Sequence, residues 1–371
     1  MKEGSVSKSV YLLLLIVLVY LVLVTAKSVL VPVVFAAIFS MLLLPVSIKM
    51  EDRGVSRGMA TLISVLLLVF IVALISGLVG YQVSDLAKNA DEIEKNLVEK
   101  FNQLREFATN SLGISREKQD EIIKEQQKSS NTMINSLIKG SITSAGIAIT
   151  NIILVLVYIF LFMYFRTHLK KFVLMKVKKG SETKAIEIMR NGRMVAQKYL
   201  TGLAMMIGAL WVMYGIGFSI AGVRNSIFFA VLCGLLEIVP FVGNLSGVVI
   251  TLFVSLGQGA DSNVLLGILV TYSVVQFFQT YFLEPLVVGR EVNVHPLFTI
   301  LGLVVGEFIW GIPGMILAIP LMGIAKIIFD RVEPLRHYGY LIGEEKKHDG
   351  SGIKEKIKSI FGKSGSSKKK Q

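Results

Sequence analysis

Residues 225–260 read NSIFFAVLCGLLEIVPFVGNLSGVVITLFVSLGQGA and carry a single charged side chain, Glu237. A continuous helix of that length would measure about 54 Å, whereas the hydrocarbon of a bilayer is only about 30 Å thick. Pro240, Gly243 and Asn244 stand near the middle of the stretch. Proline removes a helical hydrogen bond and glycine permits sharp turns. We therefore predict either two half-length helices that form a re-entrant hairpin, or one long, broken and tilted span.

A second stretch, residues 292–325, is likewise long, apolar and interrupted near its middle. It carries one acid, Glu307, together with His295, and it is interrupted by Gly311-Ile-Pro-Gly314. Further windows without Asp, Glu, Lys or Arg cover residues 9–26, 28–48, 58–84, 140–165, 199–223 and 262–283. Each comes close to or exceeds the roughly 20 apolar residues that a membrane helix needs. The sequence predicts an all-α polytopic membrane protein with about eight membrane segments, two of them broken.

The chain divides by composition into six parts. They are membrane helices in 1–84, an extracytosolic segment in 85–139, a membrane helix in 140–165, a basic amphipathic cytoplasmic linker in 166–198, a C-terminal membrane transport region in 199–330, and a basic cytoplasmic tail in 331–371, disordered at its end. In the extracytosolic segment, apolar residues recur at helical spacing on both sides of Gly113. We expect a helical hairpin outside the membrane there.

Charge and hydropathy together exclude an ordinary soluble protein. Of the 371 residues 53% are hydrophobic and 18% charged, against about 25% charged in soluble domains. The net charge of +13 arises from +8 in residues 166–198 and +6 in residues 331–371, which leaves −1 for the rest. Both basic segments flank membrane helices, so the positive-inside rule places them and both termini in the cytoplasm. The excess therefore indicates orientation and lipid contact, and no nucleic-acid partner is expected.

Enzymatic chemistry finds no support in the motifs. The membrane windows contain no Asp for an aspartyl dyad, and the chain has neither a His-Glu-x-x-His zinc motif nor a phosphate-binding loop. Its single cysteine, Cys233, excludes a disulfide framework and a multi-cysteine metal site. We expect no catalytic residue, no metal and no cofactor.

Two topologies return the basic tail to the cytoplasm. In the first, both broken stretches are hairpins, one opening outside and the other inside. In the second, both cross the membrane, which gives eight full spans. We favour the hairpins because their lengths fit half-spans. The side of the membrane on which Arg290 lies distinguishes the two arrangements.

The acids inside the broken stretches are candidate functional groups. Glu237 lies three residues before Pro240, and Glu307 lies four residues before Gly311. A charged residue at the centre of the bilayer costs about 2.5–3.5 kcal/mol on insertion scales. Protonation or snorkelling to an interface is the structural alternative. Candidates for a solute or ion path are Glu237, Pro240, Gly243, Asn244, Gln276, Gln279, Glu307, Gly311 and Gly314.

The window 262–283 adds Gln276 and Gln279, which share a helix face at i, i+3. Hydrogen bonds between helices would explain these two glutamines about as well as contact with a solute would. Ionisable groups are then concentrated between two membrane elements. Candidates for a gate or hinge are Glu284, Pro285, Gly289, Arg290, Glu291, His295 and Pro296.

These residues resemble the autoinducer-2 exporter family of prokaryotic membrane permeases. The resemblance rests on Ile238-Val-Pro-Phe-Val-Gly243, Glu284-Pro-Leu-Val-Val-Gly-Arg290, His295-Pro296-Leu297 and Gly311-Ile-Pro-Gly314 running to Pro320. Two departures are visible. Asn244 stands where the family often has proline, and Glu307 stands where glycine is common.

The resemblance implies a homo-oligomeric multi-pass transporter, a pentamer, in the prokaryotic inner membrane. It implies export of a small polar solute similar to autoinducer-2, which we expect to be coupled to ions or protons through a mid-membrane site between the broken helices. Sodium or lithium/proton antiport, with a monovalent cation as substrate, is the first alternative. A membrane scaffold that uses residues 85–139 for interaction is the second.

Overall fold

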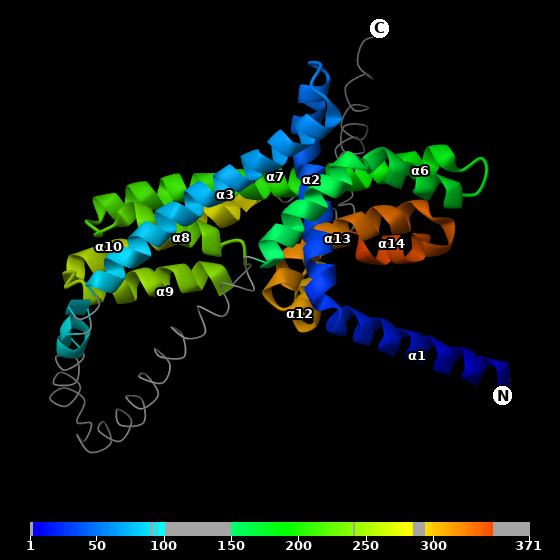
Figure 1. The fold of residues 1–371 in the computed structure, drawn as a ribbon. Helices are drawn as coiled ribbons and strands as arrows, with labels where there is room; N and C mark the ends of the chain where they lie inside the picture. The colour runs from blue at the N-terminus through cyan, green and yellow to red at the C-terminus, as the bar shows by residue number, and fades with distance from the viewer. Residues whose placement is uncertain are drawn as a thin grey trace, which may run out of the picture.

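The computed structural model describes residues 3–89, 92–93, 95–100, 150–239, 242–284 and 294–343, with side chains from Val10 onward except those of Ala87 and Val242. Within these ranges the chain is helical (Figure 1), apart from one isolated bridge between Val294 and Gly343. Its principal helices are α1 (Glu3–Thr25), α2 (Lys27–Glu51), α3 (Arg57–Lys88), an unlabelled helix at Thr150–Tyr164, α6 (Arg166–Lys176), α7 (Glu182–Ile220), α8 (Ser226–Leu236), α9 (Val242–Gly257), α10 (Ser262–Phe278), α12 (Pro296–Trp310), α13 (Ile312–Arg331) and α14 (Arg336–Ile342).

Five of the described helices are long and apolar enough to cross a membrane. A sixth span results if Thr150–Tyr164 and α6, which meet at a 68° bend, count as one. Helices α8, α9 and α12 are shorter, at 11, 16 and 15 residues. The expectation of an all-helical membrane protein is confirmed. The described helices give five or six candidate spans, so the expected number of about eight is not confirmed.

Helix α7 is longer than its charge-free window indicates. It runs for 39 residues from Glu182, whereas the window starts at residue 199. Nothing between Glu182 and Lys198 is a strong helix breaker, so the basic segment continues into the membrane helix without interruption. The C-terminal half of α7 packs with α8, α9 and α10 around Leu210, Tyr214 and Phe229.

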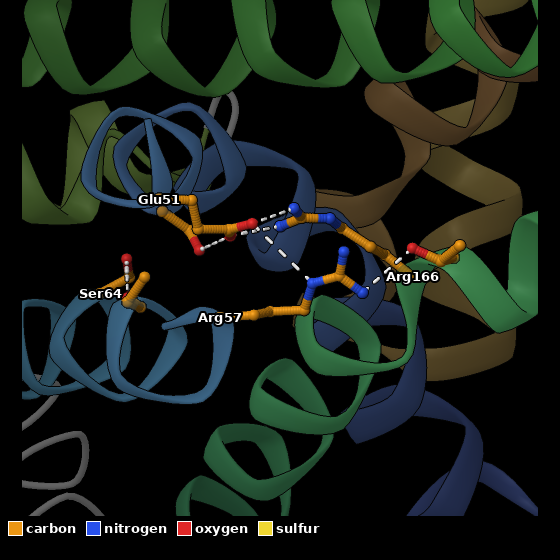
Figure 2. Close-up of polar contacts among 7 residues, drawn as sticks. Glu51, Arg57, Ser64 and Arg166 are labelled. Carbon is orange, nitrogen blue, oxygen red and sulfur yellow. Dashed lines mark hydrogen bonds and ion pairs between the residues drawn. The ribbon is translucent and has the colours of Figure 1, made fainter. Parts of the chain in front are cut away.

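A charged clamp joins the ends of three other helices. Glu51, the last residue of α2, accepts hydrogen bonds from both terminal nitrogens of Arg166, at 2.8 and 2.5 Å. Ser47 donates to the same carboxylate, and the Nε atom of Arg57 lies 3.8 Å from it. Figure 2 shows the guanidinium groups of Arg166 and Arg57 both facing the carboxylate of Glu51. The clamp therefore places the end of α2, the start of α3 and the bend before α6 at one side of the bundle.

Helices α8 and α9 form an antiparallel hairpin. A Cβ atom added to Gly243 would lie 1.6 Å from the carbonyl oxygen of Leu236, and one added to Gly247 would lie 3.1 Å from the Cα atom of Cys233. Because glycine has no Cβ, the two backbones can approach this closely. The expectation that residues 225–260 form two short helices agrees with this arrangement.

Helices α12 and α13 form a second antiparallel hairpin. They turn at Gly311, whose φ of 67° lies in the left-handed region that favours glycine. A Cβ atom added to Gly306 would lie 2.5 Å from the carbonyl oxygen of Gly314. The second helix is not of half length, since α13 has 20 residues and passes the test for a full span.

The two hairpins open at opposite ends of α7. At one end, Asn225 before α8 donates to Gln82 of α3 at 2.6 Å, and Asn96 donates to Gly257 of α9 at 2.9 Å. At the other end, Arg331 of α13 pairs with Glu187 of α7 at 2.5 Å, and His295 before α12 donates its backbone N–H to Ile342. In Figure 1 the hairpin of α8 and α9 lies on the left and α14 on the right. Val239 of the first hairpin packs against α12 and α13.

Candidate functional site

The first hairpin reverses direction directly after Glu237. Helix α8 ends at Leu236, and Glu237 is its C-cap residue. The backbone N–H groups of Ile238 and Val239 donate to Leu235 and Leu236, at 3.1 and 2.9 Å, in a tight turn. Pro240 and Phe241 lie outside the described residues. Glu237 thus stands where one apolar helix stops and a second begins.

Gln279 holds the carboxylate of Glu237. Its Nε2 atom donates to Oε1 of Glu237 at 2.5 Å, and the residue is only 1% exposed. Gln279 opens a π-helix, Gln279–Leu283, that directly follows α10. Single π-helical turns within helices are rare and frequently occur at functional sites. The side chain of Glu237 is half-buried. A carboxylate withdrawn from water is costly unless it is hydrogen-bonded, and this bond supplies part of the compensation.

Gln276 binds the hairpin on the other side of its turn. Its Oε1 atom accepts a short hydrogen bond from Nδ2 of Asn244, and its Nε2 atom donates to Thr280 at 3.3 Å. The two glutamines therefore bind residues on the two sides of the α8–α9 turn. We call Glu237, Asn244, Gln276 and Gln279 the Glu237 cluster.

Two oxygens of this cluster have no hydrogen-bond partner within the described part of the chain. They are Oδ1 of Asn244 and Oε1 of Gln279, and both are buried. An unsatisfied buried acceptor costs roughly 1–3 kcal/mol. Together with Glu237 they form a set of oxygen acceptors that can bind the hydroxyl groups of a polar solute or a hard monovalent cation.

The predicted gate residues are only partly described. Glu284 ends the described segment directly after the π-helix, and its side chain is exposed. Pro285, Gly289, Arg290 and Glu291 lie outside the described residues.

The other two gate candidates begin α12. The Nδ1 atom of His295 accepts a hydrogen bond from the backbone N–H of Leu297 at 3.2 Å, so His295 caps the helix. Pro296 is the first residue of α12 and is exposed. Proline suits this position, because the N–H that it lacks would have no helical partner there.

Glu307 does not join the Glu237 cluster. Its side chain is exposed and makes no hydrogen bond or ion pair within the ranges that the structure describes. Its backbone carbonyl accepts from Gly311 at 2.7 Å, where α12 ends. Gly311 provides the turn and Gly314 the close contact between α12 and α13. These three residues shape the second hairpin, and Glu237 alone of the two acids lies in a buried network.

Sequence reasoning did not identify the π-helix or the role of Thr280. Gln276 and Gln279 were expected to share a face, and both do contact the α8–α9 hairpin, although through different partners. No pattern in residues 279–283 distinguishes a π-helix from an α-helix. The clamp of Glu51 and Arg166 was also missed, although both charges border apolar windows, which is a signal that could have found it.

The comparison with known proteins agrees with this architecture. A family described as AI-2E family transporter matches residues 11–333. Three relatives bear the name "Putative transport protein". YrrI of Bacillus subtilis is 23% identical over 81% of this chain and 86% of its own length. YueF of Bacillus subtilis is 26% identical over 80% and 82%. YhhT of Escherichia coli K12 is 25% identical over 86% and 89%.

The match covers most of the chain, including the Glu237 cluster and both hairpins. Together with the five helices that are long and apolar enough to cross a membrane, it describes a multi-pass membrane protein. The chain belongs to the AI-2E family of transporters.

Proposed function

We propose that this protein exports a small polar solute, similar to the signalling furanone autoinducer-2, and that the Glu237 cluster binds the solute. The observation that carries the proposal is the hydrogen bond between Glu237 and the buried Gln279 at the turn of the α8–α9 hairpin. Beside it, Oδ1 of Asn244 and Oε1 of Gln279 each lack a hydrogen-bond partner among the described residues. A transporter site typically combines irregular backbone at membrane depth with such polar groups.

Both hairpins are re-entrant in this proposal. The two ends of α8–α9 lie beside the C-terminal end of α3, whereas the ends of α12–α13 lie beside α14 and the N-terminal part of α7. Glu187 and Ile220 are separated along α7 by about 50 Å, so the hairpins open on opposite faces. The N- and C-termini are cytoplasmic in this proposal, which the two basic segments support through the positive-inside rule. The membrane is the prokaryotic inner membrane, and the assembly is a homo-oligomer as the resemblance implies.

The side on which residue 290 lies tests the re-entrant arrangement. Arg290→Cys, made in a Cys233→Ala background that has no other cysteine, is expected to react with an impermeant maleimide from the cytoplasmic side. The two-hairpin arrangement requires this result, because α10 then runs inward. Modification from the outside alone would show eight full spans instead.

Sodium or lithium/proton antiport is the second candidate function. It is favoured by the chemistry of the cluster, since a carboxylate and two amide oxygens are the ligands that hard cations prefer. Glu237 would then bind the cation and the proton in turn. Both functions use the same residues and differ in what crosses the membrane.

Reconstitution into proteoliposomes separates the two functions. We expect the protein to move the furanone autoinducer-2 down an imposed gradient, at a rate that depends on the proton gradient and is lost on adding a protonophore. Protein-free vesicles are the control. Proton flux that requires Na⁺ or Li⁺ and needs no furanone would overturn the exporter and establish antiport.

A further inference from the structure

We propose that one face of α9 lines the outer half of the translocation pathway, from the Glu237 cluster to the extracytosolic end of the protein. This inference rests on the proposed transport function and extends it beyond the central site. The pathway carries water and the hydroxyl or carbonyl groups of a small polar solute. Four polar side chains form this face, which we call the α9 polar face: Asn244, Thr251 and Ser255 of α9, and Gln258, which directly follows α9 and donates its backbone N–H to Val254.

Helical geometry places these four residues in one row. Spacings of seven, four and three residues keep them within about 60° of arc at 3.6 residues per turn. From Asn244 to Gln258 the row is about 21 Å long, which is about two thirds of the hydrocarbon thickness. On the opposite side of the same helix Val249 is 52% and Phe253 60% exposed, and Ser246 is the one polar residue beside them. Helix α9 is therefore amphipathic, with its polar side turned into the protein.

The α9 polar face is buried at Thr251 and Ser255, half-buried at its two ends, and not fully hydrogen-bonded within the described residues. Thr251 is 0% exposed and Ser255 is 1% exposed. Thr251 donates to the carbonyl of Gly247 at 2.8 Å, whereas Oγ of Ser255, Oε1 of Gln258 and Oδ1 of Asn244 have no partner within the described residues. Three unsatisfied acceptors on one helix face cost several kcal/mol. Apolar side chains would pack there without that cost, so the polar groups indicate a partner that enters when the face opens.

The face is closed in this structure. At its middle, Cys233 of α8 lies against Gly247 and its sulfur is 3.6 Å from Oγ1 of Thr251. At its outer end, Asn96 donates to the carbonyl of Gly257, and Ile93 packs so closely on Gly257 that a Cβ atom would lie 2.5 Å from its side chain. The helical residues that follow α3 thus cover the outer end of α9. Release of this contact, with separation of α8 from α9, would expose the polar face to the outside.

Cysteine accessibility tests the proposal without a transport assay. Starting from the Cys233→Ala background, we would make Thr251→Cys and Ser255→Cys on the polar face, with Val249→Cys and Phe253→Cys on the opposite side of the same helix as matched controls. The probe is a membrane-impermeant, cationic methanethiosulfonate added outside right-side-out membrane vesicles. Size-exclusion chromatography of each purified variant confirms that it is folded, and either polar-face position suffices if the other does not fold.

Water-exposed thiols ionise and react, whereas thiols in hydrocarbon do not. We expect the polar-face cysteines to react roughly tenfold or more faster than the controls. Equal or slower reaction at both polar-face positions would overturn the pathway. Failure of the α9 pathway can be distinguished from failure of the proposed transport function. If Glu237→Gln abolishes flux while the polar face stays unreactive, the central site stands and the α9 pathway is wrong.

Discussion

Glu237→Gln is expected to lower transport by roughly ten- to one-hundredfold while the protein remains folded. A hydrogen bond to a charged group is worth roughly 1.5–3 kcal/mol, and a tenfold change in rate corresponds to about 1.4 kcal/mol. The substitution removes the charge that Gln279 binds at 2.5 Å and removes the proton that Glu237 can carry. Furanone flux in proteoliposomes, with thermal unfolding in detergent as the folding check, measures both effects.

Two further variants test whether the loss of transport comes from the carboxylate of Glu237 and its hydrogen bond. Gln279→Leu keeps the carboxylate but removes its donor, so it is expected to lower transport too and to lower thermal stability, because an unpaired charge is left buried. Glu333→Gln, at an exposed acid after α13, is the matched control and should behave as the unaltered protein. Full activity of Glu237→Gln would show that the cluster is a structural contact between helices and nothing more.

Gly243→Ala is expected to cause the largest loss of stability of any single methyl addition to the first hairpin. The new Cβ atom would lie 1.6 Å from the carbonyl oxygen of Leu236, so the backbones of α8 and α9 must separate. Overpacking typically costs about 1–3 kcal/mol, and a clash with backbone cannot be relieved by a change of rotamer. We expect a lower unfolding temperature in detergent together with loss of transport, because Asn244 would move away from Gln276.

The control for this substitution is Gly208→Ala in α7. A Cβ atom at residue 208 meets nothing within 4 Å, and alanine is favoured over glycine in a helix by about 1 kcal/mol. Gly208→Ala should therefore leave stability unchanged or raise it. An unfolding temperature of Gly243→Ala equal to that of Gly208→Ala would contradict the close crossing of α8 and α9.

The apolar helices were predictable because the missing charges mark them directly. The two breaks were predictable as well, since Gly311 turns the second hairpin with a positive φ and Glu237 precedes the turn of the first. Helix lengths were less predictable. Helix α7 begins at Glu182, well before its apolar window, because hydropathy marks where a helix meets lipid and not where its hydrogen bonding starts.

The site was predictable in its residues but not in its pairings. Glu237 and Gln279 stood out as polar groups in apolar surroundings, yet no local pattern indicates that they bond to each other or that a π-helix begins at Gln279. Glu237 and Glu307 look alike in sequence, and only their surroundings separate them: one carboxylate is held by a buried amide, whereas the other is exposed. Burial depends on tertiary packing, which the local pattern does not specify.

The α9 polar face was not predicted, although the sequence contains a pattern that indicates it. Thr251, Ser255 and Gln258 recur at helical spacing within a charge-free stretch, but neutral polar residues do not interrupt a hydropathy window. Asn244, one of the two departures from the family pattern, proves to be the residue that links this face to Gln276. Its position suggests that the departure bears on which solute is bound.

A cryo-EM map of the protein in lipid nanodiscs, recorded with saturating furanone autoinducer-2, tests the central claim most directly. The account predicts that Glu237 lies near the middle of the lipid belt. It also predicts non-protein density within hydrogen-bonding distance of Glu237, of Oδ1 of Asn244 and of Oε1 of Gln279. A map that places Glu237 at the level of the head groups, or that shows the cluster sealed and empty under these conditions, would contradict it.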